Sequence, residues 1–237
     1  MPDHPAQPPI GDYAIIGDCL SAALVSRGGS VDWLCWPEFH SPSIFGALLD
    51  PGRGGSFRIA PVDPEAESRR RYLGDTNVLE TTFRTRTGTV RVVDCMPVTL
   101  EAEKRKRLWP DRDLLRIIEG VEGEVELEIT CAPRPDYGRV TPILRDRGVL
   151  GFYYDHEARA LILRSDIPLR LSEEHSLVTG RARIRPGQRA AVHLVQSEQE
   201  IAILPALGAE AERQLERSLA WWGEWAARCR YRGPWRE

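Results

Sequence analysis

The sequence lacks the marks of a membrane, secreted or metal-binding protein. No apolar run approaches the ~18 residues that a membrane span requires. Residues 1–9 have no charged segment followed by an apolar one, the pattern that opens a secretory signal. The five cysteines form no CxxC motif, and no cysteines or histidines have the spacing of zinc ligands. We therefore expect a cytoplasmic protein with no disulfide, metal or other cofactor, and with four of its cysteines in apolar surroundings.

A large excess of charge of either sign is also missing. Lys and Arg number 32 and Asp and Glu number 35, which gives a net charge of −3. A nucleic-acid-binding domain would instead carry a basic patch on a basic domain. The densest basic run, Lys104–Arg107, is short and lies among acidic residues, so we predict a solvated loop there. Neither nucleic acid nor a membrane is an expected partner.

Short strands separated by turns are predicted over most of the chain. Val125–Cys131 alternates without a fault between apolar and polar residues, which is typical of an antiparallel strand with one buried side. Asn77–Phe83 and Thr89–Cys95 are two more strands, joined by a hairpin connection. The other predicted strands are Ser56–Ala60, Leu114–Glu119, Gly151–Tyr154, Ala160–Arg164, Leu169–Leu171, Arg181–Arg185 and Ala190–Gln196. This spacing predicts an all-β fold, an antiparallel β-sandwich.

The C-terminal segment has a different periodicity. From Leu207 to Cys229, apolar residues recur at intervals of three and four, which indicates an amphipathic helix. Pro205 precedes this helix, and Arg232–Pro234 is expected to end it. The predicted organisation is a disordered Pro-rich leader over residues 1–9, a β-sandwich domain over 10–205 and a linker helix over 206–237.

No convincing catalytic set emerges from the residues alone. Asp32 with Glu38, or Asp18 with Asp32, could form a carboxylate pair of the kind that glycosidases use, but scattered acids in polar loops are common. The chain has no GxSxG, no HExxH and no phosphate-binding glycine loop. The histidines His40, His156, His175 and His193 show no spacing typical of a metal site, and His193 is interpreted as an ordinary strand residue.

Aromatic residues cluster between Gly28 and Gly46. Trp33, Trp36, Phe39 and Phe45 fall within thirteen residues and alternate with Asp, Ser and Glu. Flat apolar rings beside polar groups are what a sugar-binding site uses, but the same clustering is typical of a sandwich core. Both interpretations stay open.

Several blocks of the sequence resemble the opening of bacterial proteins of glycoside hydrolase family 15, a domain often called trehalase-like N-terminal. The blocks lie in the same order as in that family and cover nearly the whole chain. They are Ile10–Cys19, Ala22–Pro37, Ser41–Asp50, Asn77–Phe83, Val92–Pro97, Pro133–Arg139 and Cys229–Glu237.

The resemblance implies a larger protein, with a β-supersandwich, a linker helix and an (α/α)6 barrel. Members hydrolyse α-glucosidic bonds, in trehalose or at the ends of α-glucans, with inversion. Inversion requires a carboxylic acid and a second carboxylate ~6.5–9.5 Å apart, and in this family both glutamates lie in the barrel. The sequence ends where the linker would run into the barrel. We therefore expect no catalytic residue here, and a catalytic barrel, in cis or in trans, as the partner.

The resemblance also suggests which residues approach an α-glucoside ligand. In order of expectation they are Trp33, Trp36, His40, Tyr137 and Arg139. The family usually has Phe-Asp-Ser-Pro where this chain has Phe39–Pro42 with His40, so any role of that acid is lost or altered. Asp136–Arg139 has a second interpretation, a turn whose acidic and basic ends hydrogen-bond locally.

The predicted helix has more apolar surface than one core requires. We expect Leu215, Leu219 and Trp222 to pack on the sandwich, and Trp221 and Trp225 at its margin to contact the barrel or to promote self-association. Two rival readings stay open. One is the activity of a whole trehalase or glucoamylase, and the other is a stand-alone carbohydrate-binding or interaction module from a truncated gene.

Overall fold

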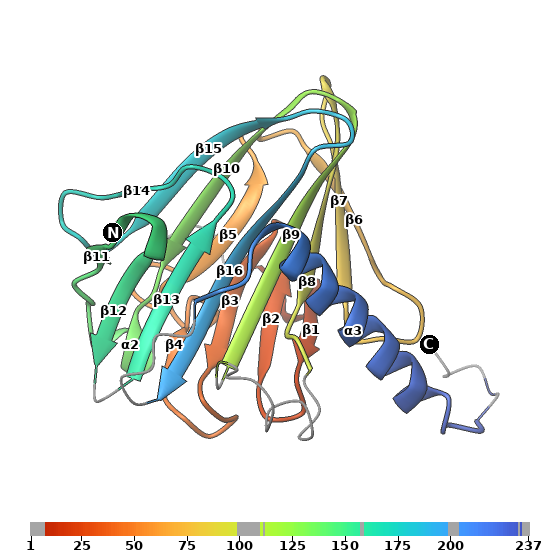
Figure 1. Cartoon of the computed structure of the whole chain (residues 1–237), viewed down its shortest axis with the longest axis horizontal. Coiled ribbons are helices and arrows are strands. Elements are labelled where there is room, and N and C mark those ends of the chain that lie inside the picture. Colours follow the sequence, from red (N-terminus) through yellow and green to blue (C-terminus); the bar gives the residue numbers. More distant parts are fainter. Residues whose placement is uncertain are drawn as a thin grey trace.

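Two antiparallel sheets make up most of the protein, as a computed structural model shows (Figure 1). The structure describes residues 8–98, 110, 112–156, 159–198, 204–231 and 233. Sheet A has the strand order β1-β2-β3-β5-β10-β15-β14, with β4 paired to β3. Its strands are β1 Tyr13–Gly17, β2 Ala22–Ser26, β3 Ser30–Cys35, β4 Ser43–Phe45, β5 Ser56–Pro61, β10 Val125–Ala132, β14 Arg170–Leu171 and β15 Val178–Ile184.

Sheet B has the order β11-β12-β13-β16-β9-β8-β7-β6. Its strands are β6 Glu67–Tyr72, β7 Leu79–Arg84, β8 Gly88–Cys95, β9 Arg112–Gly123, β11 Arg145–Asp146, β12 Phe152–His156, β13 Arg159–Ser165 and β16 Arg189–Glu198. The helical elements are η1 Ile10–Asp12, α2 Pro135–Gly138, η2 Gly148–Leu150 and α3 Gly208–Ala226. The all-β sandwich with a C-terminal helix is confirmed.

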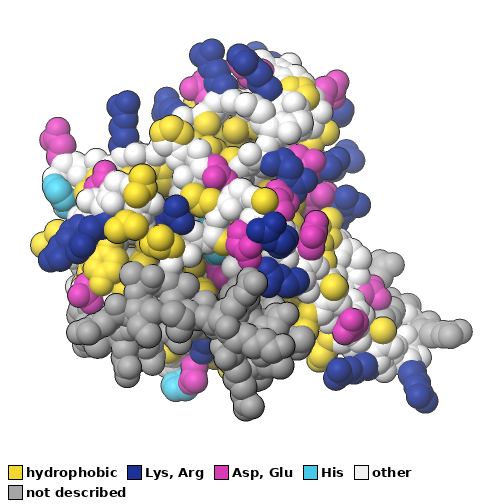
Figure 2. Space-filling model, in the orientation of Figure 1, with side chains coloured by type: hydrophobic (Ala, Val, Ile, Leu, Met, Phe, Trp, Pro, Cys, Tyr) yellow, Lys and Arg dark blue, Asp and Glu magenta, His cyan; other side chains and the backbone are white. Residues whose placement is uncertain are grey.

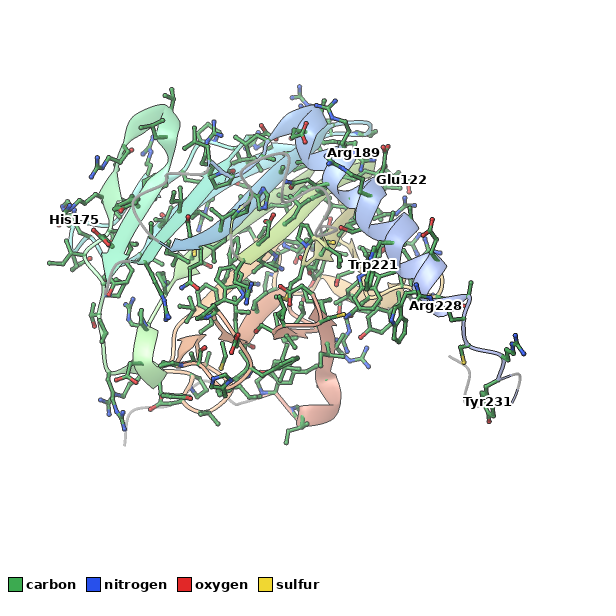
Figure 3. The ribbon with its side chains drawn as sticks, turned by 60° about the horizontal axis from the view of Figure 1, so that its bottom comes forward. Glu122, His175, Arg189, Trp221, Arg228 and Tyr231 are labelled. Carbon is green, nitrogen blue, oxygen red and sulfur yellow. The ribbon has the colours of Figure 1, made fainter. Side chains whose placement is uncertain are left out.

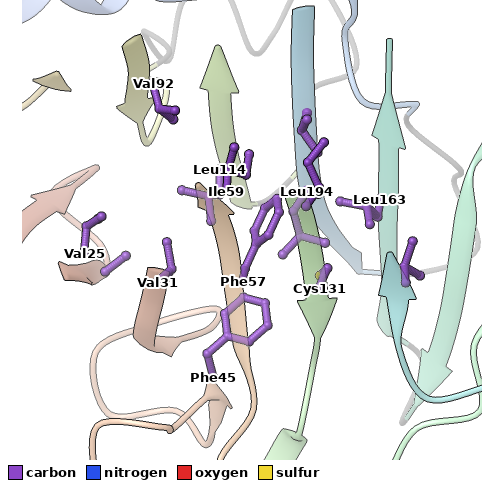
Figure 4. Close-up of a cluster of buried hydrophobic side chains, with 14 of the residues drawn as sticks. Val25, Val31, Phe45, Phe57, Ile59, Val92, Leu114, Cys131, Leu163 and Leu194 are labelled. Carbon is purple, nitrogen blue, oxygen red and sulfur yellow. The ribbon is translucent and has the colours of Figure 1, made fainter. Parts of the chain in front are cut away.

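The main core fills the space between the two sheets (Figure 4). Val125, Leu127, Ile129 and Cys131, the apolar half of the alternating strand, are all buried there. Phe45 and Phe57 of sheet A lie with ring centroids 6.3 Å apart, and the Phe57 ring points toward Leu114 and Leu194 of sheet B. Burying apolar side chains contributes about 25 cal/mol per Å², so this layer is the main source of stability.

A charged side chain crosses this core. Arg116 of β9 and Asp94 of β8 are both fully buried, with Arg116 Nε 2.7 Å from Asp94 Oδ1. The guanidinium also donates to the carbonyls of Phe57 and Gly29, which belong to sheet A. It lies 4.8 Å from the centroid of the Phe57 ring. Arg116 therefore links the two sheets by hydrogen bonds through the core.

The turn at Gly29 admits only glycine. Its φ is +71°, and a Cβ there would stand 2.3 Å from the Ile59 carbonyl oxygen. This close approach brings the Gly29 carbonyl within reach of the Arg116 guanidinium, at 2.8 Å. The turn between β2 and β3 is thus shaped to accept the hydrogen bond from sheet B.

Helix α3 lies across the outer face of sheet B, where it covers a second apolar cluster (Figure 1). Ala211, Leu215 and Trp222 are buried there, and Leu219 and Trp221 are partly buried. The packing of Leu215, Leu219 and Trp222 on the sandwich was predicted and is confirmed. The helix ends at Ala226, three residues before the end of the apolar pattern at Cys229.

Polar contacts fix the start of α3. Asp166 Oδ2 accepts hydrogen bonds from the backbone nitrogens of Ala191, at 2.8 Å, and Gly208, at 3.3 Å. Arg189 of β16 makes a paired contact with Glu212, at 2.7 and 2.8 Å. A carboxylate at a helix N-terminus is favourable because the orphan N–H groups there carry partial positive charge. Figure 3 shows Arg189 beside the first turns of the helix and Trp221 further along it.

One expectation needs correction, and others fall outside the described residues. Cys35, Cys95 and Cys131 are buried but Cys19 and Cys229 are exposed, so three cysteines and not four lie in apolar surroundings. The two exceptions lie in a turn and beyond the helix, where neighbouring apolar residues do not form a core. The leader up to Gln7, the basic run Lys104–Arg107, and Arg232 and Pro234 lie outside the described residues. The boundary at residues 205–206 stays a prediction.

The described surface mixes both charges. Figure 2 shows basic and acidic side chains interspersed over the face that carries α3. Arg189, for example, lies within salt-bridge distance of both Glu119 and Glu212. Within the described ranges, no helix has the length and apolar character needed to cross a membrane.

Candidate functional site

A pocket of about 430 Å³ opens at one end of the sandwich, between the two sheets. We call it the sheet-end pocket. Figure 1 shows α2 and β4 beside the lower ends of β12, β13 and β16, the elements that supply its walls. Its described lining residues are Trp36, Pro42, Ser43, Ile44, Pro135, Asp136, Val140, Tyr154, Arg159, Leu161 and Gln196.

Strand geometry explains why sheet B contributes polar groups here. Side chains of a strand alternate between faces, and Val192 and Leu194 of β16 belong to the core between the sheets. Gln196 continues that inward row. Likewise Arg159 and Tyr154 continue the inward rows of β13 and β12. At this end of the sandwich, polar side chains therefore replace the aliphatic ones of the core.

Sheet A contributes the aromatic segment and a strained turn. Trp36 follows β3 and is 1% exposed, while Ser43 of β4 accepts a hydrogen bond from the Tyr137 backbone nitrogen at 3.1 Å. Asp136 and Tyr137 have φ of 53° and 57°, a left-handed conformation that is unfavourable for side chains other than glycine. The Ser43 hydrogen bond and that from Gly138 N to the Arg134 carbonyl hold this turn against the pocket.

The five residues predicted near a ligand lie at or around the sheet-end pocket to different degrees. Trp36 alone among them lines the sheet-end pocket. Trp33 and Tyr137 pair with ring centroids 6.3 Å apart. The His40 side chain is 84% exposed and lies 3.5 Å from Glu38. Arg139 Nη1 lies 3.6 Å from Asp136 Oδ2, the local pairing that the turn interpretation expects.

Core packing is shown for part of the aromatic stretch, while its sugar-binding interpretation stays a prediction. Trp36 and Phe45 are buried in the core, whereas Phe39 is 63% exposed. Core packing therefore accounts for Phe45, and the buried Trp36 both packs and borders the pocket.

Each of the acidic residues considered for catalysis has its own hydrogen-bond or ionic partners. Asp18 Oδ1 accepts from the backbone nitrogens of Leu20 and Ser21. Asp32 is buried and accepts from Ser30 Oγ and from Tyr13 Oη. Burial raises the pKa of Asp32, and the two hydrogen bonds oppose that rise. Glu38 faces His40 at the surface. None of these three carboxylates is among the described residues that line the sheet-end pocket, where Asp136 is the one acid.

The histidines also make separate contacts and do not form a common site among the described residues. His193 is fully buried, with Nε2 against Asp113 and Nδ1 2.9 Å from the Ala206 carbonyl oxygen. It thus ties β16 to β9 and to the segment that leads into α3, which is more than the ordinary strand role predicted for it. His175 Nδ1 lies 3.4 Å from the Leu144 carbonyl oxygen, and the side chain of His156 is outside the described ones. The described residues contain no group of three His, Cys, Asp or Glu side chains placed to hold a metal.

Sequence reasoning missed Gln196, Arg159 and Tyr154. A signal for Gln196 was present, because it is a polar residue at the fourth inward position of the predicted strand Ala190–Gln196, after Ala190, Val192 and Leu194. Polar residues at buried positions are informative since they are rarely buried without a partner. Arg159 and Tyr154 have no comparable signal.

Two packed antiparallel sheets, with a helix behind one of them and a pocket at their end, define an all-β sandwich domain with an accessory helix. The chain belongs to the trehalase-like, N-terminal domain family, whose model matches residues 4–221. It is 34% identical over 235 residues to a trehalase of Mycolicibacterium smegmatis (strain ATCC 700084 / mc(2)155), covering 92% of this chain and 34% of that protein.

A trehalase of Thermoplasma volcanium is 27% identical over 229 residues, with 95% of this chain and 35% of that protein covered. The chain thus spans about a third of the length of these two curated relatives. Among solved structures, a putative kojibiose phosphorylase from human microbiome aligns with 93% of this chain and 29% of its own, at 8% identity and a TM-score of 0.39.

Proposed function

We propose that this chain is a non-catalytic N-terminal domain of an inverting α-glucosidic hydrolase of glycoside hydrolase family 15, and that it supports the catalytic barrel. The observation that carries the proposal is the family match over residues 4–221 in a chain that spans a third of relatives named trehalase. The substrate would be trehalose or an α-glucan, and the compartment the cytoplasm.

The arrangement of carboxylates supports the non-catalytic part of this proposal. Inverting glycosidases need two carboxyl groups that face each other across a space of about 6.5–9.5 Å, wide enough for substrate and water. Asp136 is the one acid among the described residues of the sheet-end pocket. Asp32, the most buried of the candidate acids, is held by Ser30 and Tyr13.

The purified chain is expected to hydrolyse neither trehalose nor maltose. General acid–base catalysis contributes about 10²–10⁴-fold, and the described lining of the sheet-end pocket holds a single acid, Asp136. The measurement is glucose release by the chain alone, compared with a full-length trehalase relative as positive control. Release well above the buffer background that disappears on mutation of a carboxylate in this chain would contradict the proposal.

The exposed edge of α3 is the proposed contact with the barrel. Trp225 is 51% exposed, and Trp221 is partly buried against the sandwich. The two rings meet Trp222 edge-on, with centroids 4.8 Å and 5.7 Å from it. A large aromatic ring held rigidly at the surface is typical of the centre of protein interfaces. The occupant we propose is the catalytic barrel, and a second copy of this chain would be its substitute when the barrel is absent.

The loop that carries His40, Phe39–Pro42, provides a separate test of whether this domain contacts the substrate. The His40 side chain is 84% exposed and its one described ionic contact is with Glu38, so His40→Asp is expected to leave the melting temperature of this chain within about 1–2 °C. In an enzyme that includes the barrel, the same change is expected to alter kcat/KM if the loop faces the substrate. A fall in melting temperature without any kinetic change would show that the loop is only structural.

A further inference from the structure

Two buried polar atoms on opposite walls of the sheet-end pocket have no hydrogen-bond partner among the described residues. They are the indole nitrogen Nε1 of Trp36, a donor, and the side-chain oxygen Oε1 of Gln196, an acceptor. The two residues are 1% and 4% exposed and belong to different sheets. Both line the pocket.

Such atoms are rare in folded proteins, because an unpaired buried donor or acceptor destabilises the fold. A ligand that carries hydroxyl groups would satisfy both, since one hydroxyl can accept from an indole N–H and donate to an amide oxygen. In the present conformation both atoms are covered. A ligand would therefore reach them through rotation of the Gln196 amide and a small shift of the indole ring.

The rest of the lining restricts the ligand further. Ile44, Leu161 and the ring of Tyr154 offer apolar surface, as the C–H face of a sugar ring requires. Asp136 and Arg159 carry opposite charges, so the lining as a whole does not select an anion. The volume of about 430 Å³ falls within the 300–1,000 Å³ that is typical of small-molecule sites.

We propose that the sheet-end pocket binds one neutral pyranose ring, such as a glucose unit, through hydrogen bonds to Trp36 Nε1 and Gln196 Oε1. The choice of a sugar rests on the proposed function, whereas the choice of a neutral hydroxylated ligand rests on the pocket itself. The site would be a binding site away from the chemistry, since its described lining includes a single acid.

The test is an NMR titration of the 15N-labelled chain with D-glucose into the millimolar range. Of the seven tryptophans, the one whose indole N–H signal disappears in Trp36→Phe identifies Trp36. Glucose is expected to shift that signal in the wild-type chain. Gln196→Met, which keeps the length of the side chain and removes its amide, is expected to weaken binding at least about tenfold, equivalent to 1.4 kcal/mol.

Gln214 provides the matched control. Its Oε1 is also buried without a described partner, but Gln214 belongs to α3 and is outside the pocket lining. Gln214→Met is therefore expected to leave the glucose affinity unchanged. D-glucose 6-phosphate is expected to bind no more tightly than glucose, because the described lining carries one acid and one base, Asp136 and Arg159, and so has no excess of positive charge.

Four results would overturn the proposal. They are no shift of the Trp36 signal, equal affinity in wild type and Gln196→Met, binding of the phosphorylated sugar alone, and water contacts at the Trp36 N–H that glucose does not displace. The wild-type titration decides the matter even if a variant fails to fold. Because glucose release is measured separately, absence of sugar binding here would leave the proposed role as a supporting domain standing.

Discussion

Replacing Arg116 with alanine is expected to lower the free energy of unfolding by about 3–5 kcal/mol, because it leaves the buried Asp94 carboxylate without its partner. Both side chains are fully buried, and their closest contact is 2.7 Å. The same change removes the donors to the Phe57 and Gly29 carbonyls, at 2.6 and 2.8 Å. Because those carbonyls belong to sheet A and Arg116 to sheet B, the loss falls on the contact between the sheets.

The measurement is urea unfolding of the chain, followed by tryptophan fluorescence and circular dichroism. Arg181→Ala is the matched control, since Arg181 also pairs with a carboxylate at 2.7 Å but is 60% exposed, and exposed pairs contribute about 0–1 kcal/mol. A double variant, Arg116→Met with Asp94→Leu, is expected to be more stable than Arg116→Ala because it leaves no unpaired charge. Equal losses for Arg116→Ala and Arg181→Ala would contradict this account.

Truncating Trp222 to alanine is expected to cost about 3–5 kcal/mol, the usual range for a large buried aromatic residue. Trp222 is 8% exposed and packs α3 onto the second apolar cluster with Leu215 and Ala211. Loss of this ring removes the largest side chain that holds the helix on sheet B. We expect the variant to show a lower melting temperature and faster proteolysis within 208–226.

Trp225→Ala is the control for Trp222, one turn away on the same helix. Since Trp225 is 51% exposed, its removal is expected to change the stability of the chain by less than about 1 kcal/mol. If self-association occurs through this edge, the same change should also lower the mass seen by sedimentation. A loss of stability equal to that of Trp222→Ala would show that Trp225 packs within the domain instead of serving an interface.

The alternating strands were predictable because one of their faces is buried and the other meets solvent. Val125–Ala132 is the clearest case, since its burial follows the sequence alternation residue by residue. The strands between Tyr13 and Phe45 were not predicted. In β3, for example, Ser30 and Asp32 are buried along with Val31 and Leu34. The polarity of a residue in this strand therefore does not indicate which face of the sheet it lies on.

The edge strand β6 was not predicted, for the opposite reason. Strand β6 carries the sequence Glu67–Tyr72, in which charged residues dominate and no position is fully buried. A charged edge is a common protection against pairing with another sheet, but in a sequence it looks like a loop. Trp36 was predicted near a ligand. Tyr154, Arg159 and Gln196 of the same pocket come from strands more than a hundred residues later, and their approach to Trp36 depends on the topology.

The place of β16 in sheet B has a consequence for how the chain is assembled. This strand, Arg189–Glu198, is late in the sequence yet lies between β13 and β9. Without it, β11–β13 and β6–β9 are two separate groups of strands with exposed edges. During synthesis the sheet therefore cannot close until residue 198 has left the ribosome, and such late long-range pairing is slow and open to aggregation. Helix α3 packs on residues of β8, β9 and β16, so it can dock only after β16 has paired. Completion of sheet B and packing of α3 therefore belong to one final step.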